Sequence, residues 1–246
     1  MKSRILRMVA IAINASLYAA LGYFTYFGIF VGGVRFWPAV VVPGVFSYIF
    51  GGMVGGVGAA IGIFVSDVII HGDPFLSLTV GVPANFLGFY VIGRLTSSKS
   101  RSGMLIGVVV FPVALSILIA SLYIYGLTDS LSSIIGITLS LSCPITYFLS
   151  SKYLRGWENY ILAAIAGLGV GSLIIGFGVW GYSQLFVTPK ILGIEAHLPL
   201  YMSIVITAWT FLSEIPFLIF LVPPIVKAIG GVFPWLGGVD EALSRG

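Results

Sequence analysis

The chain has 246 residues, of which 59% are hydrophobic and only 8% are charged. About a quarter of the residues in a water-soluble domain are charged, so this composition excludes that class and indicates an integral membrane protein. The formal net charge of +4 comes from 12 basic and 8 acidic residues, and where the basic residues lie decides whether they mark a nucleic-acid surface.

Eight apolar segments are predicted to form helices, which makes the fold class all-α, a polytopic transmembrane helical bundle. The first follows a basic flank and is too long for the apolar part of a cleavable signal, which has about 7 to 15 residues. The second and sixth are short and can be tilted or re-entrant, so the prediction is six to eight spans. The segments cover approximately residues 5–30, 38–50, 53–70, 75–93, 104–126, 131–150, 159–187 and 199–226.

The basic residues lie on one side of these spans if the N-terminus is cytoplasmic. The cytoplasmic residues are then Lys2, Arg4, Arg7, Arg94, Lys99, Arg101, Lys152, Arg155, Lys227 and Arg245. Only Arg35 and Lys190 lie outside. This asymmetry follows the positive-inside rule, so the basic residues are interpreted as topology signals and no nucleic-acid partner is expected.

The whole chain is interpreted as a single membrane domain, residues 1–246. Residues 1–95 form a first four-helix half, and the polar linker 96–103 should be cytoplasmic. Residues 104–227 hold the remaining spans, and 228–246, which include Trp235, should form a cytoplasmic or interfacial tail. Cys143 lies in an apolar segment and is interpreted as a small buried hydrophobe.

Small residues form a stripe along the first span. Ala12, Ala15, Ser16 and Ala19 recur at helical spacing and therefore share one face. Such stripes let membrane helices approach closely. The stripe can pack inside this chain or can form a docking face for another subunit.

The loop GGVRFWPAVVVPG, residues 32 to 44, brings an arginine and a tryptophan to the outer side. Pro38 should begin a short second helix that Pro43 bends, and Trp37 should lie at the membrane interface. Arg35 lies on the outer side, so it is not one of the basic residues that orient the chain in the membrane. It is expected either to pair with Asp67 or to contact a ligand.

Acidic residues and histidines also gather on the outer side: Asp67, His71, Asp73, Asp129, Glu195 and His197. Asp67 ends a glycine-rich apolar helix, where an ionisable residue needs a partner or a ligand. Asp73, before a proline, is either a solvated turn residue or a ligand contact. These residues lack the spacing of metal ligands, so no metal is expected.

Two further polar residues fall inside predicted spans. Asn85 follows Pro83, which should bend its helix, and is expected to form an interhelical hydrogen bond or to contact a ligand. Glu214 lies near the middle of the last span, where an unpaired charge costs roughly 2.5 to 3.5 kcal/mol. It is interpreted as a ligand contact or as a protonated carboxyl bonded to another helix.

The motifs of common catalytic sites are missing from the sequence. There is no phosphate-binding G-x-x-x-x-G-K-[ST] loop, no G-x-S-x-G, no H-E-x-x-H and no paired-cysteine motif. The chain is therefore predicted not to be an enzyme, not to hydrolyse ATP by itself and to hold no cofactor.

Three motifs resemble the substrate-binding S component of an energy-coupling factor (ECF) transporter. They are ASLYAALG in the first span, GGVRFWPAVVVPGVFSYIFGGMVGGVGAAIGIFVSDVI, and GVPANFLGFYVIGRL; SEIPFLIFLVPPIV near the end is a looser likeness. The resemblance covers residues 10 to 95. Family members usually have six helices, and residues 104 to 150 would be an additional hairpin.

The resemblance implies a subunit of the cell membrane that captures a vitamin or similar micronutrient from outside. Its first helix would dock, through an Ala-xxx-Ala surface at Ala15 and Ala19, on a transmembrane coupling protein driven by two ATPases. Arg35 and Trp37 would belong to the first ligand-covering loop, and His71 and Asp73 to the loop after the third helix. The expected ligand is an organic compound with an anionic or hydrogen-bonding group for Arg35.

Two other functions remain open. In an autonomous secondary transporter, Glu214 or Asp67 would carry a coupling proton. A polytopic membrane enzyme is disfavoured by the sparse polar side chains, and no feature excludes a non-transporting assembly subunit.

Overall fold

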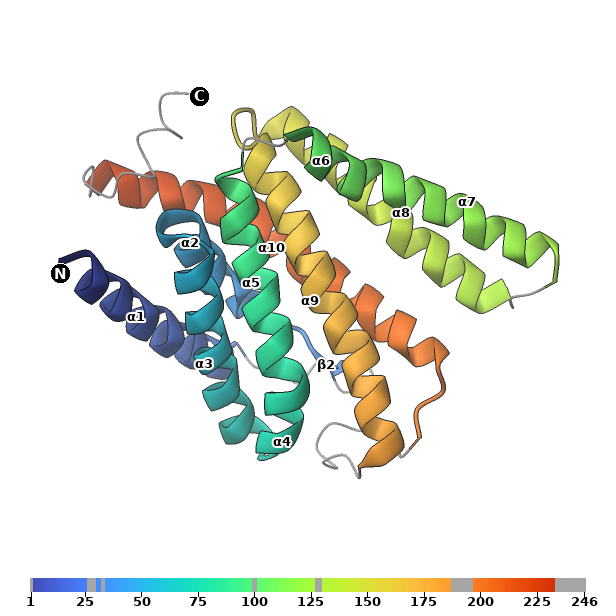
Figure 1. Ribbon diagram of the computed structural model, residues 1–246, viewed down its shortest axis with the longest axis horizontal. Helices are drawn as coiled ribbons and strands as arrows, with labels where there is room; N and C mark the ends of the chain where they lie inside the picture. The colour runs from blue at the N-terminus through green and yellow to red at the C-terminus, as the bar shows by residue number, and fades with distance from the viewer. Residues whose placement is uncertain are drawn as a thin grey trace.

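The fold was analysed in a computed structural model that describes residues 2–25, 30–31, 34–98, 101–126, 130–186 and 197–232. Long helices form almost all of this part of the chain (Figure 1). They are α1 (Lys2–Phe24), α2 (Val41–Phe50), α3 (Gly52–Ile70), α5 (Val82–Thr96), α7 (Phe111–Ile124), α8 (Ser130–Tyr153), α9 (Glu158–Leu185) and α10 (Tyr201–Val232). The short elements are β1 (Phe30–Val31), β2 (Val34–Arg35), η1 (Pro38–Val40), α4 (Pro74–Leu76), η2 (Ser77–Gly81), α6 (Arg101–Leu105) and η3 (Ile106–Val110).

The predicted all-α membrane bundle is confirmed, and each of the eight apolar segments contains a helix. The first helix ends at Phe24, before the predicted residue 30, and Phe30 belongs to β1. Six of the described helical segments are long and apolar enough to cross a membrane. The other two are the second and sixth segments. The second, Pro38–Phe50, is too short to cross. The sixth, α8, has 24 residues and is therefore longer than predicted, but it is rich in serine and threonine.

Several hydroxyl groups of α8 donate to carbonyls of the same helix. Thr138 donates to the carbonyl of Ile134, and Ser140 donates to the carbonyl of Gly136. Hydrogen bonds to carbonyls one turn back let a helix carry many hydroxyls in an apolar environment. These residues lower the hydropathy of the segment without interrupting the helix.

A short hairpin and a half-length helix follow α1. Strands β1 and β2 pair antiparallel with Arg35 opposite Phe30, a feature that the sequence did not predict. Pro38 begins the 3₁₀ turn η1, which continues into α2 as expected. Pro43 lies in the first turn of α2, where a proline is tolerated, so it does not bend the helix.

The basic residues gather at one end of the bundle. Arg94 lies in the last turn of α5, Arg101 begins α6, and Arg155 lies between α8 and α9. The α5–α6 and α8–α9 connections lie at the top of Figure 1. The opposite end, at the bottom of the view, holds α4 and the end of α9. This distribution agrees with the predicted orientation, with the basic end cytoplasmic.

Glycines of α3 allow α1 and α5 to pack closely against it. A Cβ atom at Gly58 would collide with Asn14 of α1, and one at Gly56 would lie 2.7 Å from the carbonyl oxygen of Phe86 in α5. The fully buried Asn14 donates from Nδ2 to the carbonyls of Val54 and Gly55, both at 3.2 Å. The glycine-rich sequence of α3 is thus explained by close helix approach on two faces.

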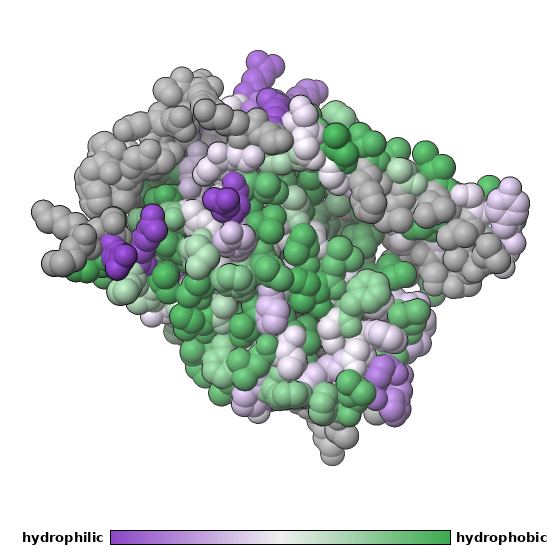
Figure 2. All heavy atoms as spheres, viewed as in Figure 1, coloured by the Kyte–Doolittle hydropathy of each residue, from purple (hydrophilic) through white to green (hydrophobic). Residues whose placement is uncertain are grey.

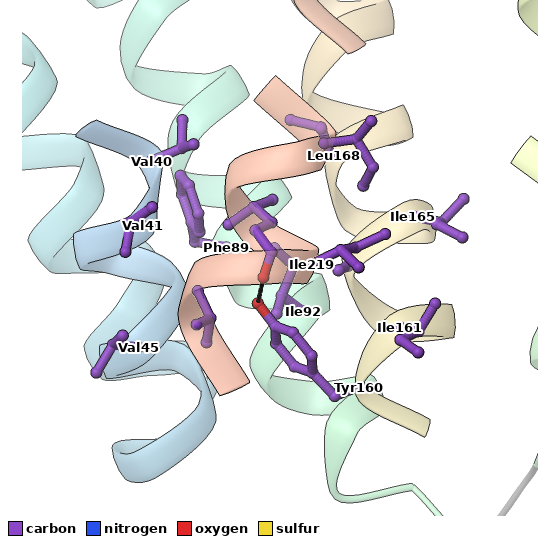
Figure 3. Close-up of a cluster of buried hydrophobic side chains, with 14 of the residues drawn as sticks. Val40, Val41, Val45, Phe89, Ile92, Tyr160, Ile161, Ile165, Leu168 and Ile219 are labelled. Carbon is purple, nitrogen blue, oxygen red and sulfur yellow. Dashed lines mark hydrogen bonds between the residues drawn. The ribbon is translucent and has the colours of Figure 1, made fainter. Parts of the chain in front are cut away.

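Helices α5 and α9 also cross at glycines. A Cβ atom at Gly167 would lie 2.5 Å from the carbonyl oxygen of Gly88. Next to this crossing, α10 lies between α2 and α9 and contributes to one apolar core (Figure 3). The hydroxyl of Tyr160 donates to the carbonyl of Leu218 at 3.1 Å, which links α9 to α10 inside this core.

Helices α6, α7 and α8 form a hairpin that diverges from the rest of the bundle toward its tip (Figure 1). This is the additional hairpin that the sequence suggested within residues 104–150. Helices η2 and η3 are wide π turns, and each is followed two residues later by a proline, Pro83 and Pro112. Pro83 was expected to bend its helix, and the irregularity found there is the π turn η2, immediately before α5.

Apolar side chains cover most of the molecular face shown in Figure 2. Large exposed hydrophobic residues occur on every long helix except α2, for example Leu17 of α1, Ile69 of α3 and Phe177 of α9. A water-soluble protein does not expose apolar side chains over such an area. The surface is that of a protein embedded in lipid.

Candidate functional site

A cavity lies between α1, α3, α5, α9 and α10 in the half of the bundle opposite the basic end. It contains about 650 Å³ of empty space, including its open mouth. Six of the seven residues nominated from the sequence line it: Arg35, Trp37, Asp67, His71, Asn85 and Glu214. These residues come from β2 and the loop after it, from the end of α3 and the turn after it, and from α5 and α10, and folding brings them together.

Asp67 is the most connected side chain of this cavity. It forms an ion pair with Arg35 through Oδ1, and Ser77 donates to its Oδ2 at 2.7 Å. Gly81 of η2 packs against the same carboxylate, because a Cβ atom there would lie 2.8 Å from Oδ2. Of the two explanations that the sequence left open for Arg35, the structural pair with Asp67 is therefore present.

His71 links the end of α3 to the turn before α4. Its Nδ1 accepts the backbone N–H of Asp73 at 3.2 Å. Its Nε2 faces Oδ1 of Asp67 at 3.4 Å, on the same oxygen that Arg35 contacts. His71 therefore adds a third side chain to the group held by Asp67.

An aromatic and amide chain forms another wall of the cavity. Nε1 of Trp37 donates to the hydroxyl of Tyr18 at 2.9 Å, and that hydroxyl donates to Oδ1 of Asn85 at 2.7 Å. Asn85 in turn donates to the carbonyl of Gly81 at 2.9 Å. Asn85 thus forms the interhelical hydrogen bond that its sequence position suggested, and it also lines the cavity.

Trp37 is buried inside the bundle, whereas a tryptophan that anchors a protein in the headgroup layer is exposed to lipid. Its side chain is buried against Gly22 of α1, and the guanidinium of Arg35 lies 4.4 Å from its ring centroid. A tryptophan next to a proline in a loop resembles an interfacial anchor in sequence. The hairpin that turns this loop inward is not visible in the apolar pattern.

Glu214 differs from the other ionisable residues of the cavity. It is only 6% exposed, and within the described parts of the chain it forms no hydrogen bond or ion pair. It lines both the main cavity and an adjoining smaller hollow of about 280 Å³ between α5, α9 and α10. A buried polar group without a partner is costly, and membrane-embedded carboxyls of this kind commonly mark functional sites.

Asp73 does not line the cavity. Its Oδ1 accepts the backbone N–H groups of Phe75 and Leu76, both at 3.0 Å, and its Oδ2 accepts the hydroxyl of Tyr182 at 2.9 Å. It is an N-cap of α4 and a link to α9, and thus corresponds to the turn reading of its sequence position. Asp129, Lys190 and Glu195 lie outside the described residues, as do Lys99, Trp235 and Arg245.

Sequence reasoning missed Tyr18 and Ser77. Tyr18 lies on the same helix as the small-residue stripe and is 1% exposed, and Ser77 is also buried. Both are common residue types in apolar segments, and only the fold places them against Asp67 or Asn85. Within the described ranges, no group of three or more histidines, cysteines or carboxylates is placed so that it could hold a metal ion.

The small-residue stripe of α1 is divided between two faces. Ala12 and Ser16 are exposed and Ala19 is half-buried. Ala15 is 7% exposed, and its carbonyl packs against Gly62 of α3. Of the two alternatives for this stripe, packing inside the chain applies to Ala15, while a docking face at the exposed positions stays a prediction.

Comparison of the chain with protein-family models, curated proteins and solved structures gives no match in any of the three.

Proposed function

We propose that this protein is a membrane-embedded substrate-binding subunit that captures a small organic compound from the outer side. The observation that carries the proposal is that six residues selected from the sequence line the same cavity. Small-molecule sites combine apolar and aromatic walls with a few fixed polar groups. The cavity provides this combination in the outer half of the bundle.

The described geometry favours preorganisation of this site. Asp67 holds Arg35, Ser77 and His71, while Tyr18 connects Trp37 to Asn85. These contacts fix side chains from α1, α3 and α5 around the same space. A preformed site loses little conformational entropy on binding, which favours capture of a scarce compound.

The proposal extends to an energised complex of the ECF type. The chain has no phosphate-binding loop, so uptake against a gradient needs partner subunits, here a transmembrane coupling protein and two ATPases. A surface for such a partner is available on α1, where Ala12 and Ser16 lie among exposed apolar residues such as Ile13 and Leu17. Small residues permit close helix approach in lipid.

Isolation of the protein from native membranes in mild detergent tests this proposal. Recovery of a coupling protein together with two ATPases is expected for wild type. Ser16→Trp should abolish this recovery, whereas Leu173→Trp, on the exposed face of α9, should retain it. Equal recovery with both variants would remove α1 from the docking surface.

An autonomous proton-coupled transporter is the second candidate, and the unpartnered Glu214 favours it. Uptake of the retained compound into liposomes that contain only this chain would distinguish the two. The ECF-type proposal expects no uptake under a proton gradient. Uptake that depends on Glu214 would instead support the secondary transporter.

A further inference from the structure

The formal charges that line the cavity do not cancel. Arg35 contributes one positive charge, and Asp67, its ion-pair partner, contributes one negative charge. His71 faces the same Asp67 carboxylate through Nε2. Glu214 has no cation at ion-pair distance among the described residues, so Arg35, Asp67 and an ionised Glu214 together carry a net charge of −1.

We propose that the ligand of this cavity is an organic cation whose positive group pairs with Glu214. The inference rests on the proposed function and names the substrate class of the same site. It also replaces the expectation of an anionic group for Arg35, because Asp67 already neutralises that guanidinium. An anionic ligand in this cavity would face the carboxyl groups of Asp67 and Glu214, with Arg35 as the cation.

The surroundings of Glu214 fit this assignment. Ile175, Val179 and Val80 line the cavity with it, so water is partly excluded and an ionic contact is strengthened. Tyr18 and Trp37 add aromatic walls, which tolerate the apolar part of a cation. The positive group of the ligand can therefore pair with Glu214, and the rest of the ligand can pack against the apolar and aromatic walls.

Arg35 adds a second recognition element. Its Nη1 is buried and forms no hydrogen bond with any residue that the structure describes. Its positive charge is balanced by Asp67, so the remaining N–H groups suit a neutral acceptor such as a carbonyl or hydroxyl. The ligand class is thus a cation for Glu214 that also carries a neutral hydrogen-bond acceptor for Arg35.

Three probes of similar shape and different charge test the proposal on the purified full-length protein in nanodiscs. They are benzyltrimethylammonium, benzyl alcohol and benzoate, and the readout is the rise in the thermal unfolding midpoint with probe concentration. The cation should bind most tightly. Its affinity should fall about tenfold or more in Glu214→Gln, the loss expected when an ion-pair partner is removed, while affinity for benzyl alcohol should not change.

Asp73→Asn is the matched control, because it removes a carboxylate on the same side of the membrane that does not line the cavity. Asparagine retains the ability to cap α4. The cation should bind this variant as tightly as wild type. Equal loss in Asp73→Asn and Glu214→Gln would show a general surface attraction and would overturn the proposal.

The remaining outcomes separate this inference from the proposed function. Tightest binding of benzoate, or cation binding unchanged in Glu214→Gln, would overturn the cation assignment and leave a small-molecule cavity in place. Failure of all three probes would overturn the cation assignment as well. If mass spectrometry then also found no small molecule retained by the purified protein, the proposed function would fail too.

Discussion

Asp67 is the residue on which the outer cavity depends most. It lies 5% exposed near the end of α3 and is held by Arg35, His71 and Ser77. A buried ion pair contributes little net stability compared with apolar residues, but removal of one member leaves the other charge unpaired. The Arg35–Asp67 pair is therefore important for the position of both side chains.

Asp67→Asn should lower the free energy of unfolding by about 3 kcal/mol, since Arg35 would remain buried without its counter-charge. The measurement is thermal or denaturant unfolding of the purified protein followed by tryptophan fluorescence. The double variant Arg35→Met/Asp67→Leu should be less destabilised than Asp67→Asn, because it leaves no unpaired charge. A double variant that is less stable than the single variant would show that the pair itself stabilises the fold.

The residues of the cavity could be nominated from the sequence because ionisable and amide groups are conspicuous in an apolar chain. Arg35, Asp67, Asn85 and Glu214 stand out for this reason. Tyr18 could not be nominated, since tyrosine is ordinary in membrane helices. The pair of Arg35 with Asp67 was one of two explanations open for Arg35, but the hairpin that turns its loop toward Asp67 could not be predicted.

At the scale of elements, the π turn η2 brings the start of α5 to the cavity. Gly81 ends this turn and packs against the Asp67 carboxylate, and Asn85 lies one helical turn further. π turns are rare and often occur at functional sites. The second π turn, η3, belongs to the hairpin of α7 and α8 and does not line the cavity, so the two π turns can be compared.

Gly81→Ala should weaken binding at the cavity and destabilise the protein by about 1 to 3 kcal/mol, because the new methyl group would press on Oδ2 of Asp67. Gly107→Ala is the matched control in η3, where a Cβ atom would have no neighbour within 4 Å. Unfolding midpoints and ligand retention of the two variants provide the test. Equal effects of both substitutions would mean that π-turn geometry, and not contact with Asp67, is what matters.

The helices themselves could be predicted well because their apolar runs are long and bounded by polar residues. The exception was α8, whose serine and threonine content made it look shorter than it is. The division of the α1 stripe could not be predicted, since helical spacing places Ala15 and Ala12 on one stripe but does not say which part of it meets α3. Burial of Ala15 decides this.

At the scale of the whole molecule, charge and shape agree on one orientation. The basic helix ends gather on one side, and the cavity lies nearer the other. This arrangement suits capture from outside the cell. It also means that an inward route for the ligand must cross the tightly packed half where α2, α5, α9 and α10 meet (Figure 3).

Cysteine labelling in intact cells tests this orientation. In a Cys143→Ser background, His197→Cys should react with a membrane-impermeant maleimide, because His197 is exposed at the end that holds the cavity. Arg155→Cys, exposed at the basic end, should react only after the cells are permeabilised. The reverse pattern would place the cavity on the cytoplasmic side and contradict capture from outside.

The most direct test of the central claim is mass spectrometry of small molecules retained by the protein after purification. Wild type should retain one organic compound in stoichiometric amount. Ile175→Phe, which fills the cavity from α9, should lose it, whereas Leu173→Phe, on the 51% exposed surface of the same helix, should keep it. Equal retention by both variants, or no retained compound in wild type, would contradict a ligand-binding cavity between these helices.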